Sequence, residues 1–119
     1  MSTAIKKYVS TTYSPAMVKT SIGETAIIEQ KRVPFKELKE VLKDTNAVKV
    51  LADPTASILS NMINQDIQAT KAQIKLEVGD ILYYVKIAGP RLEAGTKKLP
   101  ESNKIQVFKL TYKGTQQQK

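Results

Sequence analysis

The pattern of apolar and polar positions is most regular between residues 71 and 88. Residues 71–78 alternate strictly between polar and apolar side chains, which is typical of a strand with one buried face. Gly79-Asp80 is a tight-turn signal, and residues 81–88 are apolar on both faces, which predicts a central, doubly covered strand. This segment therefore predicts a β-hairpin that leads into a Gly- and Pro-bounded arginine loop. The residues expected to face inward from its first strand are Ala72, Ile74, Leu76 and Val78.

Three segments carry helix signals. Pro34 precedes residues 35–43, where the apolar side chains recur on one stripe, and Ser14-Pro15 opens a shorter helix through Met17. Asp53-Pro54, a capping carboxylate followed by proline, begins the third helix, and Asn64 is its expected stop. The expected buried positions are Phe35, Leu38, Val41 and Leu42 in one helix, and Ile58, Leu59, Met62 and Ile63 in the other.

Further β-branched and aromatic runs complete the element order and predict the fold class. The additional strands are expected at residues 8–12, 25–33, 47–51 and 105–112. The order β-α-β-α-β-α-β-β-β predicts an α/β fold, with a mixed central β-sheet of about five to six strands packed with helices. We expect a single domain over residues 1–119, with frayed ends at 1–6 and 114–119.

The composition excludes several kinds of chemistry. The chain has no cysteine and no histidine, so it offers neither a thiolate metal site nor the commonest general base. The carboxylates show no recognised ligand spacing, and no phosphate-binding or nucleophile motif is present, so we expect no metal and no cofactor. Without an apolar signal core or a span of roughly 18 apolar residues, we expect a cytoplasmic protein without membrane contact.

The charge is strongly positive and concentrated late in the chain. Lys and Arg number 19 against 11 Asp and Glu, a net charge of +8, and from Tyr84 onward eight basic residues face two acidic ones. This excess favours phosphate-bearing partners, although a solvated lysine surface explains it equally well. The five tyrosines offer stacking surfaces for bases, but strand tyrosines more often pack in a core.

Candidate chemistry lies in three polar loops that follow predicted strands, at 11–14, 51–55 and 89–95. Two of them open helices, whose first N–H groups favour anions, although plain helix capping also explains Ser14 and Asp53. The third presents Arg91, whose planar guanidinium binds phosphate through two parallel hydrogen bonds. The alternative for Arg91 is a surface ion pair with Glu93. Lys71 offers a second phosphate contact.

Four short motifs follow one another along the chain: Thr-Thr-Tyr-Ser-Pro-Ala-Met-Val at 11–18, Leu-Ala-Asp-Pro-Thr-Ala at 51–56, Thr-Lys at 70–71 with Lys-Leu-Glu-Val-Gly-Asp at 75–80, and Arg-Leu-Glu-Ala-Gly at 91–95. In this order they resemble a family of small crenarchaeal-virus proteins, the viral ring nucleases, which act as type III anti-CRISPR proteins by degrading cyclic tetra-adenylate. The resemblance covers about residues 8–112. It implies a homodimer that holds its ligand across the two-fold axis, in the host cytoplasm.

The departures from the family pattern matter for catalysis. The family's catalytic histidine falls on Ala52 and its glutamate on Ala94, whereas Ser14 and Arg91 are kept and Lys71 replaces an arginine. Losing a general acid or base costs about 10²–10⁴-fold in rate, and Glu93, one position away, is the candidate substitute. We therefore expect binding of a cyclic oligoadenylate or another phosphate-rich nucleotide, with weak or no metal-independent cleavage. The expected ligand-binding residues are Thr11, Ser14, Asp53, Thr55, Lys71 and Arg91.

Three other functions stay open at this point. The basic C-terminal third is also consistent with nonspecific DNA or RNA binding, with an affinity that falls steeply with salt. A small anti-CRISPR protein that docks on a host effector complex is the second alternative. An active ring nuclease that uses Glu93 is the third.

Overall fold

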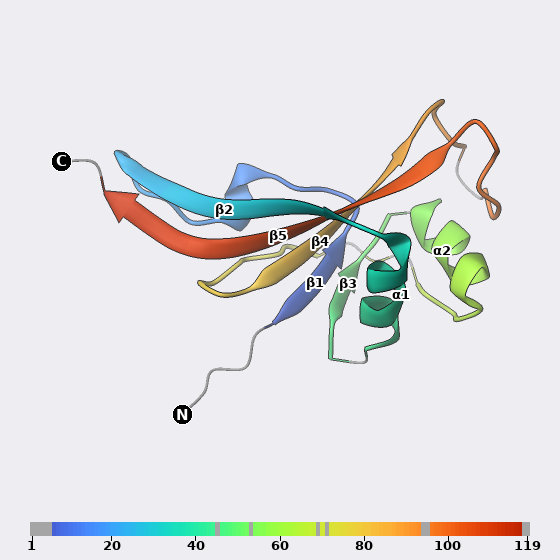
Figure 1. The fold of residues 1–119 in the computed structure, drawn as a ribbon, viewed down its shortest axis with the longest axis horizontal. Coiled ribbons are helices and arrows are strands. Elements are labelled where there is room, and N and C mark those ends of the chain that lie inside the picture. The colour runs from blue at the N-terminus through green and yellow to red at the C-terminus, as the bar shows by residue number, and fades with distance from the viewer. Residues whose placement is uncertain are drawn as a thin grey trace.

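Four strands that run in one direction and one, β5, that runs against them form the mixed sheet at the centre of the computed structural model, which describes residues 6–44, 46–52, 54–68, 70, 72–93 and 96–117 (Figure 1). The strand order is β2-β5-β4-β1-β3. The strands are β1 (Lys7–Ser10), β2 (Glu24–Val33), β3 (Val48–Val50), β4 (Ile81–Ala88) and β5 (Lys104–Gln117). The helices are α1 (Phe35–Lys43), α2 (Thr55–Ile63) and the single 3₁₀ turn η1 (Pro15–Met17). The predicted α/β class is confirmed.

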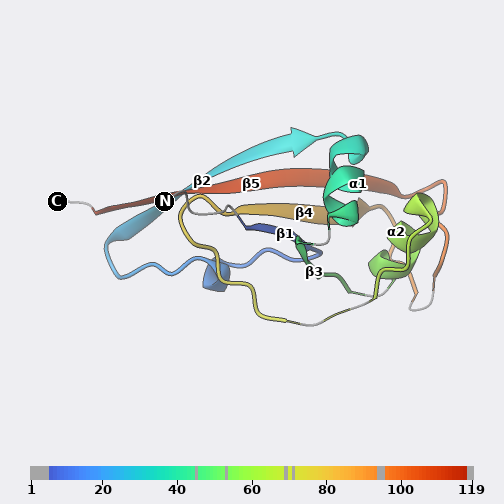
Figure 2. The ribbon, with the colours of Figure 1, turned by 90° about the horizontal axis from the view of Figure 1, so that it is seen from below.

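The two faces of the sheet are covered differently. On one face, α1 and α2 pack on the strands through a cluster that includes Leu38, Leu42 and Leu59. Figure 2 shows α1 crossing the strands and α2 lying past the carboxyl end of β4. On the other face, Val18 and the segment 72–78 cover part of the sheet without forming a helix. β4 lies between β5 and β1 and contributes to both clusters, as its apolar sequence predicts.

The predicted hairpin is wrong, because both edges of β4 are already occupied. β4 pairs with β5 on one side and with β1 on the other, so the segment before it has no free edge to join. Residues 72–78 instead cross the sheet face opposite the helices, where the backbone forms an isolated β-bridge between Leu76 and Val18. Ile74 and Leu76 are buried as expected, but Ala72 is exposed and the Val78 side chain is 68% exposed.

The helices match their predicted stripes except at one position. In α1, Leu38, Val41 and Leu42 are buried, and in α2 the stop at Asn64 is confirmed by its left-handed φ of 53°. Met62, however, is 44% exposed, because the buried side of α2 is centred on Ala56, Leu59 and Ile63. The predicted cap at Asp53 lies outside the described residues. Among the described residues, no helix has the length and apolar character needed to cross a bilayer.

The last strand is longer than the sequence predicts. β5 does not end at Tyr112 but continues to Gln117, because residues 114–117 pair with residues 24–27 of β2. The register shifts between Ile27 and Ile28, opposite Lys113, and the neighbouring Gly114 has a φ of +125°, which glycine adopts readily. β2 and β5 therefore project as a two-stranded ribbon (Figure 1). Of the expected frayed ends, residues 1–5 and 118–119 lie outside the described residues.

A buried carboxylate joins the turn before β4 to the start of β1. Asp80 is 6% exposed, and its two oxygens accept hydrogen bonds from the N–H groups of Glu77 at 2.9 Å and Lys6 at 3.3 Å. The backbone of the same turn pairs with Tyr112 of β5, through the N–H of Gly79 at 2.8 Å. Asp80 thus sets the position of β1 relative to both β4 and β5.

We predict that Asp80→Asn lowers the free energy of unfolding by about 1–3 kcal/mol, because an amide presents N–H groups to a backbone donor and leaves it unsatisfied. Urea unfolding followed by circular dichroism measures the change. Glu77→Gln is the matched control, since it removes the same charge from an exposed side chain three residues away. Equal stability of the two variants would contradict this role of Asp80.

Tyr83 is buried on the helix-covered face of β4, and its environment opposes ionisation. Burial, followed by the charge of Glu37, a side-chain hydrogen bond with Glu37 and the charge of Glu40, raises the pKa of Tyr83 to about 12. The folded state therefore retains the phenol proton at a pH where the unfolded chain, with a pKa near 10, loses it. This contribution to stability is complete below about pH 10 and declines as the pH rises toward 12.

We predict that Tyr83→Phe removes this alkaline loss. Between pH 9 and pH 11, the free energy of unfolding of the natural chain should decrease by about 1 kcal/mol more than that of the variant. Urea titrations at the two pH values give the difference. If both proteins lose stability in parallel, Tyr83 does not titrate as the structure indicates.

Candidate functional site

The strand directions bring the three polar loops together. β1, β3 and β4 are mutually parallel, so their carboxyl ends reach the same edge of the sheet. The segments that follow them begin at Thr11, Leu51 and Gly89. In sheets of this kind ligands bind outside the carboxyl ends of the strands, and the sequence-predicted loops therefore lie where a site is expected.

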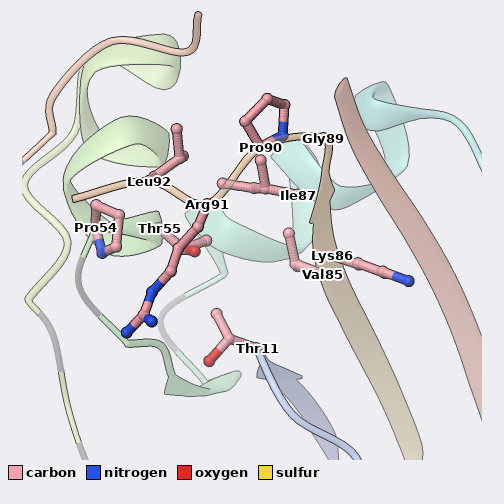
Figure 3. Close-up of a pocket in the computed structure, with 10 residues that line it drawn as sticks. All are labelled: Thr11, Pro54, Thr55, Val85, Lys86, Ile87, Gly89, Pro90, Arg91 and Leu92. Atoms are coloured by element: carbon pink, nitrogen blue, oxygen red, sulfur yellow. The ribbon is translucent and has the colours of Figure 1, made fainter. Parts of the chain in front are cut away.

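A hollow of about 300 Å³ opens at this edge (Figure 3). Thr11 from the loop after β1 and Thr55 at the start of α2 contribute hydroxyl groups, while Val85 and Ile87 form an apolar wall. Figure 3 shows the Arg91 side chain extending past Thr55 toward the side of the hollow where Thr11 lies, with the Lys86 side chain pointing away from it. Three of the predicted site residues, Thr11, Thr55 and Arg91, are thus brought together.

Arg91 is available to a ligand. Its side chain is exposed, and it forms no ion pair with any carboxylate of the described residues, Glu93 included. Because α2 begins at the hollow, its N-terminal dipole adds a partial positive charge beside the guanidinium. The surface ion pair considered as an alternative is therefore not formed in the described part of the chain.

The loop that presents Arg91 is fixed by a residue that sequence reasoning missed. Asn103 is 4% exposed, and its side-chain amide donates a 2.8 Å hydrogen bond to the carbonyl of Pro90. Asn61 of α2 donates to the carbonyl of Lys97 at 2.6 Å, which ties the same loop to the helix. Asn103 lies thirteen residues from Pro90 and follows no local motif, so no pattern in the sequence identifies it.

Gly89 is required by the same packing. Its φ is +118°, and a Cβ at this position would lie 2.6 Å from the carbonyl oxygen of Ser102. Cβ atoms in proteins essentially never approach another heavy atom so closely. Because the Ser102 oxygen belongs to the backbone, it cannot rotate away as a side chain could. The glycine therefore allows the two ends of the arginine loop to approach each other.

Thr11 links the first loop to the second. Its hydroxyl accepts a hydrogen bond from the N–H of Ala52 at 3.2 Å, and its own N–H donates to the carbonyl of Val50 at 3.4 Å. Ser10 is completely buried, and its hydroxyl accepts the N–H of Thr12 at 3.1 Å, which turns the chain out of β1. A second hollow of about 270 Å³ adjoins the first through Thr11. It is lined by Thr11, Thr12, Val50, Ala52, Thr70 and Ala72.

The remaining predicted residues lie elsewhere or are not described. Ser14 precedes η1 without a side-chain cap and does not line either hollow, and the exposed Glu93 does not line them either. Thr96 donates its hydroxyl to the Glu93 carbonyl at 2.6 Å. Asp53, Lys71 and Ala94 lie outside the described residues. Besides Tyr83, burial raises the pKa of Tyr13, and neither tyrosine lines these hollows.

We predict that Gly89→Ala lowers the free energy of unfolding by about 1–3 kcal/mol more than Gly79→Ala. Both glycines have a positive φ, but a Cβ at Gly79 meets nothing within 4 Å, so the comparison isolates the contact with Ser102. Chemical unfolding of the two variants measures the difference. Equal losses would show that backbone strain alone accounts for Gly89.

Comparison with known proteins gives a match of fold. No family model matches the chain, and no curated protein matches it. Among solved structures it is similar to B116 of Sulfolobus turreted icosahedral virus, with a TM-score of 0.70 over 89% of this chain and 98% of that chain. The sequence identity is 17%, so the likeness is one of fold. The two chains share their architecture over almost their whole length.

Proposed function

We propose that this chain, which has the fold of a protein from a Sulfolobus virus, is a viral protein that binds a phosphate-rich nucleotide, with a cyclic oligoadenylate as the leading candidate. The observation that carries the proposal is the Arg91 guanidinium, free of described carboxylates, in a hollow built from three strand-end loops. A guanidinium, a helix start and two hydroxyl groups are together suited to a phosphodiester. The motif resemblance supports the same class of ligand.

The size of the hollow supports a shared site. Its volume of about 300 Å³ is at the lower end of the range for small-molecule sites, so it suits about one nucleotide rather than a cyclic tetranucleotide. We propose that two copies of the chain form a homodimer and that each contributes one such hollow to the same ligand. This arrangement agrees with what the family resemblance implies.

Efficient cleavage is not part of the proposal. Attack by a ribose 2′-hydroxyl needs charge stabilisation and proton transfer, and Arg91 with the α2 start supplies only the first. Ala52, where the resembled family has its histidine, borders the second hollow with a methyl group. Turnover should therefore be slower by about 10²–10⁴-fold than with an acid–base group in place. A protein of this kind would act in the host cytoplasm by sequestering the nucleotide signal.

We predict that Arg91→Ala weakens the binding of labelled cyclic tetra-adenylate by about 10- to 100-fold, because it removes charge-assisted hydrogen bonds worth about 1.5–3 kcal/mol. Filter binding or fluorescence anisotropy measures the affinity. Lys98→Ala is the matched control: it removes one positive charge from an exposed residue of the loop that follows, and its affinity should be unchanged. No binding by the natural chain at micromolar concentration would overturn the proposal.

Cleavage is scored separately in the same samples. Incubation of the natural chain with the labelled ring, followed by chromatography of the products, distinguishes a sequestering protein from an enzyme. If the natural chain cleaves the ring and Glu93→Ala abolishes cleavage without weakening binding, the chain is an active ring nuclease that uses Glu93.

A further inference from the structure

Part of the sheet face opposite the helices is left open. Val18, Ile74 and Leu76 pack on this face against Leu82 and Leu110, near the amino end of β4. The covering segments do not continue toward the carboxyl end of β4, where a shallow hollow of about 170 Å³ lies on the sheet. It is lined by Gln30, Tyr84, Lys86 and Phe108, which come from β2, β4 and β5.

Two aromatic rings form the floor of this open face. Tyr84 and Phe108 are register partners in neighbouring antiparallel strands, and their ring centroids lie 6.0 Å apart at an interplanar angle of 28°. Both side chains are only partly buried. Because both residues are partly exposed, part of their surface is accessible to a further planar group.

Positive charge surrounds the rings. Paired residues in a sheet point to the same face, so Arg32 lies beside Phe108, and Lys86 and Gln106 lie beside each other. Lys104, the partner of Ala88, follows at the end of the same row. We call these residues together the aromatic-basic face: Gln30, Arg32, Tyr84, Lys86, Lys104, Gln106 and Phe108. None of its members is acidic, and the carboxylate nearest in β2, Glu29, alternates to the opposite face.

We propose that the aromatic-basic face binds single-stranded nucleic acid, with bases stacked on Tyr84 and Phe108 and phosphates near Arg32, Lys86 and Lys104. Flat aromatic side chains on a sheet serve unpaired bases, because the bases of a duplex are not free to stack on a protein. The flanking cations supply the electrostatic term that follows the backbone. Lys86 borders both this site and the Arg91 hollow, but its side chain points away from Arg91 (Figure 3).

The charge pattern favours this occupant over a second copy of the chain. A two-fold contact through this face would bring Arg32, Lys86 and Lys104 of one copy against the same cations of the other. With no carboxylate on the face to pair with them, such a contact is electrostatically unfavourable. A polyanion, in contrast, is attracted to these cations.

The test measures binding of fluorescein-labelled 15-nucleotide oligo(dT) and oligo(A) to the full chain by anisotropy over a range of salt concentrations. Tyr84→Leu with Phe108→Leu keeps apolar packing but removes the stacking surface, and it should weaken binding by at least about tenfold. Arg32→Gln or Lys86→Gln should reduce the slope of log affinity against log salt by roughly 0.7 each. Circular dichroism and a thermal melt establish that each variant is folded.

The control is Lys31→Gln, which removes the same charge from an exposed residue next to Arg32 that alternates to the other face of β2. Its affinity and salt slope should match those of the natural chain. The proposal is overturned if Lys31→Gln and Arg32→Gln have equal effects, if the natural chain prefers duplex to single strands, or if cyclic tetra-adenylate displaces the oligonucleotide. A dimer that Phe108→Leu dissociates would also overturn it, since the face would then be a contact between copies.

Discussion

β1 is four residues long, yet it forms parallel ladders on both of its edges, with β3 and with β4. Parallel neighbours cannot be joined by a tight turn, so a long crossover connection must precede β3 and another must precede β4. The first crossover carries β2 and α1, and the second carries α2 and the segment 72–80. The helices of these crossovers cover one face near the parallel strands, and the segment 72–78 covers part of the other. The strand-end hollow and the open aromatic-basic face both follow from that arrangement.

The sequence predicts local structure well and pairing poorly. The stripe of α1 and the turn at Gly79 depend on neighbours within a few residues, and both are present in the structure. The hairpin fails because alternation at 71–78 reports only that Ile74 and Leu76 are buried, and not that a strand edge is available. Burial against a sheet face and burial within a sheet leave the same pattern in the sequence.

The candidate site, too, could be predicted from the sequence only in part. Arg91 is identifiable because its residue type and its glycine and proline neighbours are chemical signals within one loop. The residues that position it are not, since the contact of Asn103 with Pro90 and that of Thr11 with Ala52 join distant parts of the chain. The basic residues of the C-terminal third also lie on different surfaces of the folded chain. Lys86 and Lys104 lie on the aromatic-basic face, whereas Lys113 pairs with Glu29 at 3.8 Å.

The pairing of β2 with the C-terminal strand has a consequence for synthesis. Residues 24–33 leave the ribosome long before residues 107–117, with which they pair in the described sheet, have been made. During that interval a ten-residue strand has no hydrogen-bonding partner in its own chain, which is the condition under which nascent chains associate with one another. Glu29, Lys31 and Arg32 place charges along this strand, and charges of this kind oppose such association. Arg32 thus has two roles: it borders the aromatic-basic face in the finished protein and opposes association of the unfinished one.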